Sequence, residues 1–137
     1  MKLVNEFDPI LHWAAKNGII HEGNLKTQGL KVVEEVGELS RAILAEDRAE
    51  IVDAIGDIVI VLTSLARLAE QHFTDKCKTC RGLGGEIAER PDEDGSRRWI
   101  ECKDCGRIDI ESCINKAFNV VKERVGVMNN GTFVKNK

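Results

Sequence analysis

Two short clusters of acidic residues lie in neighbouring segments that both have the apolar periodicity of amphipathic helices. The clusters are Glu34, Glu35 and Glu38, followed by Glu50, Asp53 and Asp57. Residues three, four or seven apart share one face of a helix, so each cluster presents carboxylates together. Packed carboxylates repel one another and lose hydration, and Mg2+ relieves both costs because it prefers oxygen ligands. The pattern predicts two helices packed as a hairpin, with a metal site formed by both.

Apolar periodicity predicts four main helices and therefore an all-α fold. The first begins at Asp8-Pro9, with Asp8 as its cap, and ends before Gly18. The second covers residues 25–45, and the third covers residues 48–71 with Asp47 as its cap. The fourth follows Asp109, and the tail contains a turn at residues 129–131 followed by an extended segment. The stripes expected to be buried are Leu30, Val33, Val36, Leu39, Ile43 and Leu44 on the second helix, and Ile51, Ile55, Ile58, Val59, Leu62, Leu65 and Leu68 on the third.

Composition limits the classes of partner. A chain of 137 residues has a natural length for one domain, and its formal charge of −3 gives no electrostatic reason to expect binding to a nucleic-acid backbone or an anionic membrane. The longest apolar-rich segment, residues 51–69, is interrupted by Asp53, Asp57 and Arg67, and the first ten residues lack a long apolar stretch. We therefore expect a soluble protein without membrane contact, in the cytoplasm, or in the host cytoplasm if the chain is viral.

Helical periodicity stops between residues 74 and 108, where glycines and two Cys-x-x-Cys pairs occur. The pairs are Cys77 with Cys80 and Cys102 with Cys105, and 21 residues separate them. Two such pairs can close a tetrahedral zinc site, and four cysteines leave no open position for catalysis. Matched pairs also suit a closed site better than redox chemistry. We interpret residues 74–108 as an inserted module with structural Zn2+, placed between the third and fourth helices of a helical domain formed by residues 1–73 and 109–137.

Two further features concern this module and the remaining cysteine. Residues 77–84 resemble one zinc-binding repeat of the DnaJ cysteine-rich region, a similarity too short to imply chaperone activity. Arg97, Arg98 and Trp99 at the tip of the module leave contact with nucleic acid open. Cys113 lies in the apolar stripe of the fourth helix and is expected to be a buried thiol.

The acidic segments resemble the MazG-like all-alpha nucleoside triphosphate pyrophosphohydrolases, whose signature is Glu-Glu-x-x-Glu followed by Glu-x-x-Asp. Here the signature reads Glu34-Glu35-Val-Gly-Glu38 and Glu50-Ile-Val-Asp53, with eleven residues between its halves. The resemblance covers the chain except for the insertion and implies a MazG-like four-helix domain. Other residues that resemble phage-type members are Gln28, Lys31, Asn119, Lys122, Arg124, Asn130, Gly131, Phe133 and Lys135.

This resemblance implies hydrolysis of a nucleoside triphosphate, usually a deoxynucleotide, to the monophosphate and pyrophosphate with Mg2+, or with Mn2+ in its place. It also implies a pocket built between subunits of a homodimer or a dimer of dimers. The role of Glu34 stays open, because it points about 100° away from Glu35. Asp57 either completes the metal shell or accepts a proton from the attacking water. The residues that match the family's Mg2+ ligands are Glu35, Glu38, Glu50 and Asp53.

The expected contacts to the triphosphate come from basic and amide side chains. Trp13, beside His12, is a candidate for stacking on the base, although an apolar anchor in a core or interface explains it equally well. Lys122 and Arg124, near the end of the fourth helix, also have a simpler interpretation, because cations there complement the helix dipole. The expected substrate-binding residues are Gln28, Lys31, Asn119, Lys122, Arg124 and Lys135, with Trp13.

A competing interpretation needs no enzyme. Acids at helical spacing also occur on solvated helix faces, and a zinc ribbon on an acidic helical scaffold could recognise nucleic acid or a protein partner. The two interpretations predict different ligands. An enzyme is stabilised by Mg2+ and nucleotide together, whereas the binding module responds to zinc chelation and is indifferent to Mg2+ and nucleotides.

Overall fold

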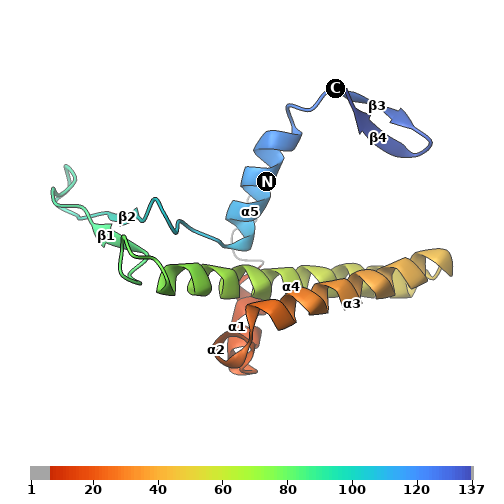
Figure 1. The fold of residues 1–137 in the computed structure, drawn as a ribbon, viewed down its shortest axis with the longest axis horizontal. Helices are drawn as coiled ribbons and strands as arrows, with labels where there is room; N and C mark the ends of the chain where they lie inside the picture. Colours follow the sequence, from red (N-terminus) through yellow and green to blue (C-terminus); the bar gives the residue numbers. More distant parts are fainter. Residues whose placement is uncertain (1–6, 137) are drawn as a thin grey trace.

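The computed structural model describes residues 7–136 and is mainly helical (Figure 1). The outer ends of the expected helical domain, residues 1–6 and 137, lie outside the described residues. In the described part, no helix has the length and apolarity needed to cross a membrane. The helices are α1 (Asp8–Lys16), α2 (Ile19–Glu22), α3 (Leu25–Leu44), α4 (Arg48–Asp75) and α5 (Ile110–Val121), and the strands are β1 (Gly85–Ile87), β2 (Trp99–Glu101), β3 (Gly126–Asn129) and β4 (Thr132–Lys135).

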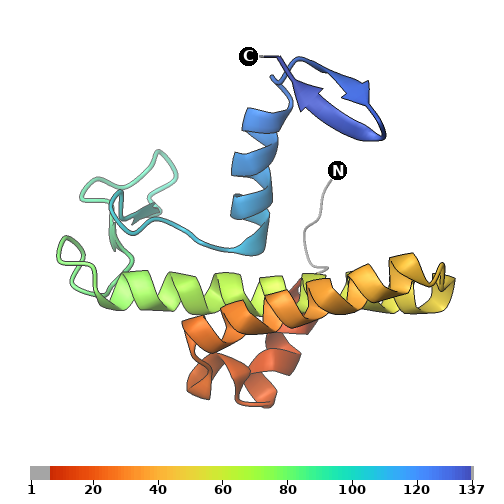
Figure 2. The same cartoon turned by 45° about the vertical axis from the view of Figure 1, so that its right-hand side comes forward.

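The helices α3 and α4 lie side by side as the long hairpin that organises the fold (Figures 1 and 2). Side-chain caps define where both begin. The Asn24 side chain accepts hydrogen bonds from two backbone N–H groups of the first turn of α3, and Asp47 does the same for α4. The cap at Asp47 and the start of both helices are therefore confirmed, and α4 extends four residues beyond the expected end.

The N-terminal region differs from the expectation. Asp8 is the first residue of α1 rather than its cap, and Phe7, which precedes it, has helical backbone angles and makes no side-chain cap bond. The acidic side chain still favours this end, because the first turn carries the positive end of the helix dipole. Gly18 has a φ of 80°, a left-handed conformation that suits glycine, and it turns the chain from α1 into the short α2. Both helices contact α4.

The face of α3 that meets α4 is not the expected apolar stripe. Among the described elements α3 contacts α4 alone, and its buried residues are Glu35 and Ala42. Leu30 is 71% exposed and Leu44 is 86% exposed, so the expectation that this stripe fills the chain's own core is wrong. Besides the buried Glu35 and Ala42, Leu39 is the member of the expected stripe that is half-buried. The exposed apolar residues of this stripe are Leu30, Val33, Val36, Ile43 and Leu44. The expected stripe of α4 is also only partly buried, because Ile55 is 50% and Val59 is 38% exposed whereas Leu68 is buried.

The strands form two small antiparallel hairpins, so the fold is mainly helical rather than all-α. In the insertion, β1 pairs with β2, and Gly85 lies opposite Glu101. In the tail, β3 pairs with β4 through the turn at Asn130 and Gly131, both of which have positive φ. The expected turn is confirmed, and the extended segment after it pairs with the segment before it.

The last helix and the tail have little packing in this chain. Asp109 caps α5 by accepting a hydrogen bond of 2.7 Å from the Ser112 backbone N–H, and the helix ends at Val121. Among the described elements α5 contacts only α4, and the β3–β4 hairpin contacts no other helix or strand. Cys113 is exposed, so the expectation of a buried thiol is wrong, because no described residue covers that face of α5.

Candidate active site and metal centre

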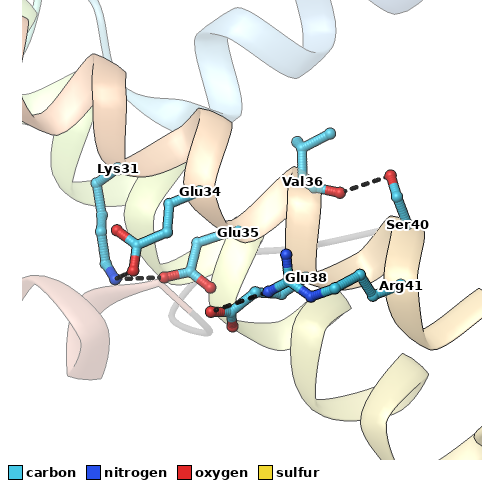
Figure 3. Close-up of polar contacts among 7 residues, drawn as sticks. All are labelled: Lys31, Glu34, Glu35, Val36, Glu38, Ser40 and Arg41. Atoms are coloured by element: carbon cyan, nitrogen blue, oxygen red, sulfur yellow. Dashed lines mark hydrogen bonds and ion pairs between the residues drawn. The ribbon is translucent and has the colours of Figure 1, made fainter.

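The acidic residues of α3 are flanked by two basic residues, Lys31 at one end of the cluster and Arg41 at the other (Figure 3). The Lys31 Nζ atom is 2.9 Å from Glu35 Oε1 and 3.0 Å from Glu34 Oε1. Glu38 is paired more loosely, because its Oε1 atom is 3.7 Å from Arg41 Nη2. The hydrogen bond to Glu35, and to a lesser extent the one to Glu34, hold the pKa of Lys31 well above its usual value. Lys31 is therefore a charged partner of both carboxylates at neutral pH.

Glu35 is the buried acid of this cluster. The residue is only 5% exposed, yet its Oε2 atom has no hydrogen-bond partner in the described part of the chain. A buried carboxylate oxygen without a partner carries a desolvation cost that a cation or a donor would relieve. An oxygen-preferring divalent ion such as Mg2+ fits this atom and its acidic neighbours.

The acids of α4 are more open to solvent. Glu50 and Asp53 are exposed, and Asp57 is half-buried. Glu38 and Glu50 line one hollow of about 410 Å³ at the α3–α4 turn, so the structure brings one acid of each cluster together. Within residues 7–136 the cysteines form the only group of three or more such side chains placed to share one ion. The carboxylates would therefore have to rotate before several of them could bind the same metal.

The expected substrate-binding residues fall into two separate groups. Gln28 and Lys31 are half-buried on the face of α3 that also carries Glu35. The C-terminal group is Asn119, Lys122, Arg124 and Lys135, all exposed on or after α5. Because α5 and the tail make no contact with α3, this second group lies away from the acids within one chain (Figures 1 and 2). Trp13 is half exposed on α1, a helix that contacts α2 and α4 but not α3 among the described elements.

Sequence reasoning overlooked Arg41 as a member of the site. It lines the hollow with Glu38 and Glu50, and it pairs with Glu38. The signal was available, because residues three apart on a helix are neighbours and opposite charges at that spacing attract. Its pairing supplies positive charge next to Glu38.

The four paired cysteines come together in the insertion. All four Sγ atoms lie within 4.8 Å of one another, and the Cys77–Cys102 and Cys80–Cys105 Sγ distances are 3.7 and 3.6 Å. With Zn–S bonds of about 2.3 Å, the sulfur atoms of a tetrahedral site lie about 3.8 Å apart. The cluster thus has nearly the dimensions of a four-cysteine zinc site, and the cysteines could bind zinc.

The surroundings of the cysteines favour a cation. The Gly84 backbone N–H donates a 3.2 Å hydrogen bond to Cys80 Sγ. Burial raises the pKa of the Cys80 thiol, but the Gly84 N–H and the thiols of Cys105 and Cys77 outweigh burial and bring the pKa below its ordinary value. Burial and the hydrogen bond to Cys80 raise the pKa of Cys105 to about 12. A bound dication would stabilise the thiolate forms of the clustered cysteines.

Comparison with known proteins locates the similarity on the acidic helices. Residues 24–78 match the family model described as the MazG nucleotide pyrophosphohydrolase domain. The α3–α4 hairpin is MazG-like. The match begins at the Asn24 cap, contains both acidic clusters and ends at the first cysteine pair. No curated protein and no solved structure matches the chain significantly.

The MazG-like segment indicates a hydrolase that acts on a nucleotide. The helices α1, α2 and α5, most of the insertion and the tail lie outside the match. The similarity of Asn119, Lys122, Arg124 and Lys135 to phage-type members therefore stays a prediction.

Proposed function

We propose that this chain hydrolyses a nucleoside triphosphate, with a deoxynucleotide as the preferred class, to the monophosphate and pyrophosphate. The observation that supports this most strongly is the buried Glu35 carboxylate, with one oxygen unpaired, inside the MazG-like hairpin. We assign Glu35 and Glu38 of α3, and Glu50 and Asp53 of α4, as the residues that hold Mg2+. Mn2+ has the same preference for carboxylate ligands and would substitute for it.

The acids and bases of the hairpin have distinct roles in this proposal. Bound Mg2+ would neutralise phosphate oxygens and lower the pKa of a water that attacks phosphorus. Asp57, one turn beyond Asp53, either accepts the proton of that water or completes the ligand set. Gln28 and Lys31 lie on the same face as Glu35 and would hold the triphosphate. Because water attacks phosphorus in this proposal, no side chain of the protein needs to act as the nucleophile.

Product analysis tests the activity directly. The full chain is incubated with Mg2+ and a panel of ribo- and deoxynucleoside triphosphates, and the products are separated by chromatography. Monophosphate and pyrophosphate in equal amounts, formed only when Mg2+ is present, are the expected result. Diphosphate and phosphate, or no turnover by a folded and zinc-loaded sample, would contradict the proposal and favour the binding module.

We further propose that the site is completed in a homodimer or a dimer of dimers. Within residues 7–136, the apolar stripe of α3 is exposed and no residue of α5 is buried. The basic residues Lys122, Arg124 and Lys135 also lie away from the acids of their own chain. A second copy that covers the stripe would reduce its exposure to water and could bring these cations to the acids of its neighbour.

A charge placed in the stripe is expected to dissociate the oligomer. Leu30→Glu would bury an unpaired carboxylate in the proposed interface, so the variant should be monomeric at micromolar concentration and should lose turnover. Light scattering coupled to gel filtration measures the mass. Leu83→Glu is the matched control, because Leu83 is 72% exposed in the insertion and Leu30 is 71% exposed. A Leu30→Glu variant with the wild-type mass would show that this stripe is not the interface.

Zinc in the insertion has a structural role in this proposal. Cys77 follows the end of α4 by two residues, and Cys105 precedes the Asp109 cap of α5 by four. A metal that joins both cysteine pairs would fix where α5 leaves α4 and would stabilise an insertion too small for a core of its own. We therefore treat residues 74–108 as a module inserted into the helical domain.

Nucleic-acid recognition by the insertion receives no electrostatic support. Residues 74–108 contain eight basic and eight acidic residues. At the tip, Arg98 is paired with Asp92 at 3.6 Å. Binding along a phosphate backbone requires an excess of positive charge, so the balanced charge counts against this alternative.

A further inference from the structure

The two neighbouring acids of α3 have different environments and share one ammonium group. The side chain of Glu35 is 6% exposed, that of Glu34 is 57% exposed, and Lys31 lies between their Oε1 atoms. The ammonium therefore contacts a buried acid on one side and a solvated acid on the other. The second oxygen of Glu35 remains unpaired and buried.

We propose that Lys31 is an internal counter-ion that competes with the divalent metal for Glu35, and that Glu34 retains Lys31 when the metal binds. This inference rests on the proposed function. It assigns Glu34 as a positioning residue for Lys31 rather than as a metal ligand. The released ammonium would then contact the triphosphate.

The metal and the Lys31 ammonium compete because both are cations and both would bind the carboxylate of Glu35. A dication at Glu35 Oε2 and an ammonium at Oε1 would lie a few ångströms apart, and like charges at that distance repel strongly where water is excluded. Metal binding therefore weakens the Lys31–Glu35 pair. The pair with Glu34 is less affected, because Glu34 is 57% exposed and solvent screens it from the metal.

The Lys31 side chain is suited to exchanging Glu35 for another acceptor. Its ammonium is carried on a flexible four-carbon stem and can change partners without movement of the helix. Lys31 is 43% exposed, so its path towards solvent and a bound triphosphate is open. Phosphate oxygens are strong acceptors for a charged donor, so the nucleotide would replace the acceptor lost at Glu35.

A second ion pair on α3, Arg41 with Glu38, can be compared with the Lys31–Glu35 pair. Arg41 pairs with Glu38 at 3.7 Å, and the two side chains are 72% and 46% exposed, whereas that of Glu35 is 6% exposed. A cation bound at that distance to a solvated acid competes weakly with a metal. Removing Arg41 changes the net charge by the same amount as removing Lys31, without removing a cation from the buried acid.

Metal binding without nucleotide tests the proposal. The free Mn2+ signal in electron paramagnetic resonance is titrated with zinc-loaded full-length protein, so that the cysteines are already occupied. Lys31→Met is expected to bind Mn2+ about 10-fold more tightly than wild type, because the competing cation is gone. In the presence of metal, the same variant should bind a non-hydrolysable triphosphate analogue more weakly. Opposite shifts for metal and nucleotide would not arise from a merely structural role.

A double-mutant cycle tests the role of Glu34. Glu34→Gln should weaken Mn2+ binding severalfold in the wild-type background, since Lys31 then has only Glu35 as its partner. If Glu34 acts through Lys31, the same substitution should have much less effect in the Lys31→Met background. Equal effects in both backgrounds would show that Glu34 contributes only its charge or binds metal itself, and would overturn its assignment.

Control variants keep the result interpretable. Lys31→Arg retains the charge and should not tighten metal binding, which also provides a folded sample if the methionine variant unfolds. Arg41→Met should tighten Mn2+ binding much less than Lys31→Met. Unchanged Mn2+ affinity in Lys31→Met, equal tightening in Arg41→Met, or tightening in Lys31→Arg would each overturn the proposal. Failure of the wild-type protein to bind Mn2+ would instead contradict the proposed function.

Discussion

Glu35→Gln is expected to lower kcat for triphosphate hydrolysis by at least about 100-fold while the protein remains folded. The substitution keeps the shape of the side chain but removes the charge that would hold the metal. Burying a neutral amide costs less than burying a carboxylate with an unpaired oxygen, so the loss of the Lys31 pair is largely offset. Steady-state kinetics and the melting temperature, Tm, measured on one preparation, check both parts.

Matched substitutions separate this effect from a general change of charge. Glu38→Gln should lose turnover to a similar extent, because Glu38 lines the hollow shared with Glu50. Glu86→Gln, on the exposed strand β1 of the insertion, removes the same charge far from the acids and should retain wild-type kinetics. Substantial turnover by Glu35→Gln would mean that the buried carboxylate is a structural residue and that the metal is held elsewhere.

The sequence predicted the hairpin well because local signals define it. The strong 3.6-residue periodicity and the cap at Asp47 are properties of short segments, and α3 and α4 begin where these signals place them. The buried face of α3 could not be predicted in the same way. Leu30 and Val33 have the spacing of core residues, but no described residue of the chain covers them, and a periodic pattern does not show what does.

The same distinction applies to the candidate sites. The proximity of Lys31 and Glu35 follows from spacing on one helix, and the cysteine cluster follows from two chelating pairs. The position of Asn119 and Lys122 relative to the acids depends on the direction in which α5 leaves α4. No local pattern specifies that direction, and a neighbouring subunit can also supply these residues.

Removal of the zinc ligand Cys102 is expected to cause the largest loss of stability. Cys102 is buried, and its Sγ atom lies 3.7 Å from that of Cys77. Cys102→Ser would open the site and leave an insertion without a core, so the β1–β2 hairpin should unfold. Structural zinc contributes several kcal/mol to small domains, and a loss of about 3 kcal/mol corresponds to a fall in Tm of about 10 °C for a chain of this size.

The measurements are zinc content by mass spectrometry and Tm by calorimetry, each with and without a chelator. Wild-type protein should contain one zinc ion per chain, and Cys102→Ser much less. Cys113→Ser is the matched control, because this cysteine is exposed on α5 outside the cluster and should leave both quantities unchanged. If Cys102→Ser lost zinc but kept its Tm, the metal would not stabilise the insertion. If it also kept turnover, the position of α5 would not depend on the metal, and the proposed structural link between the zinc module and the acidic hairpin would be wrong.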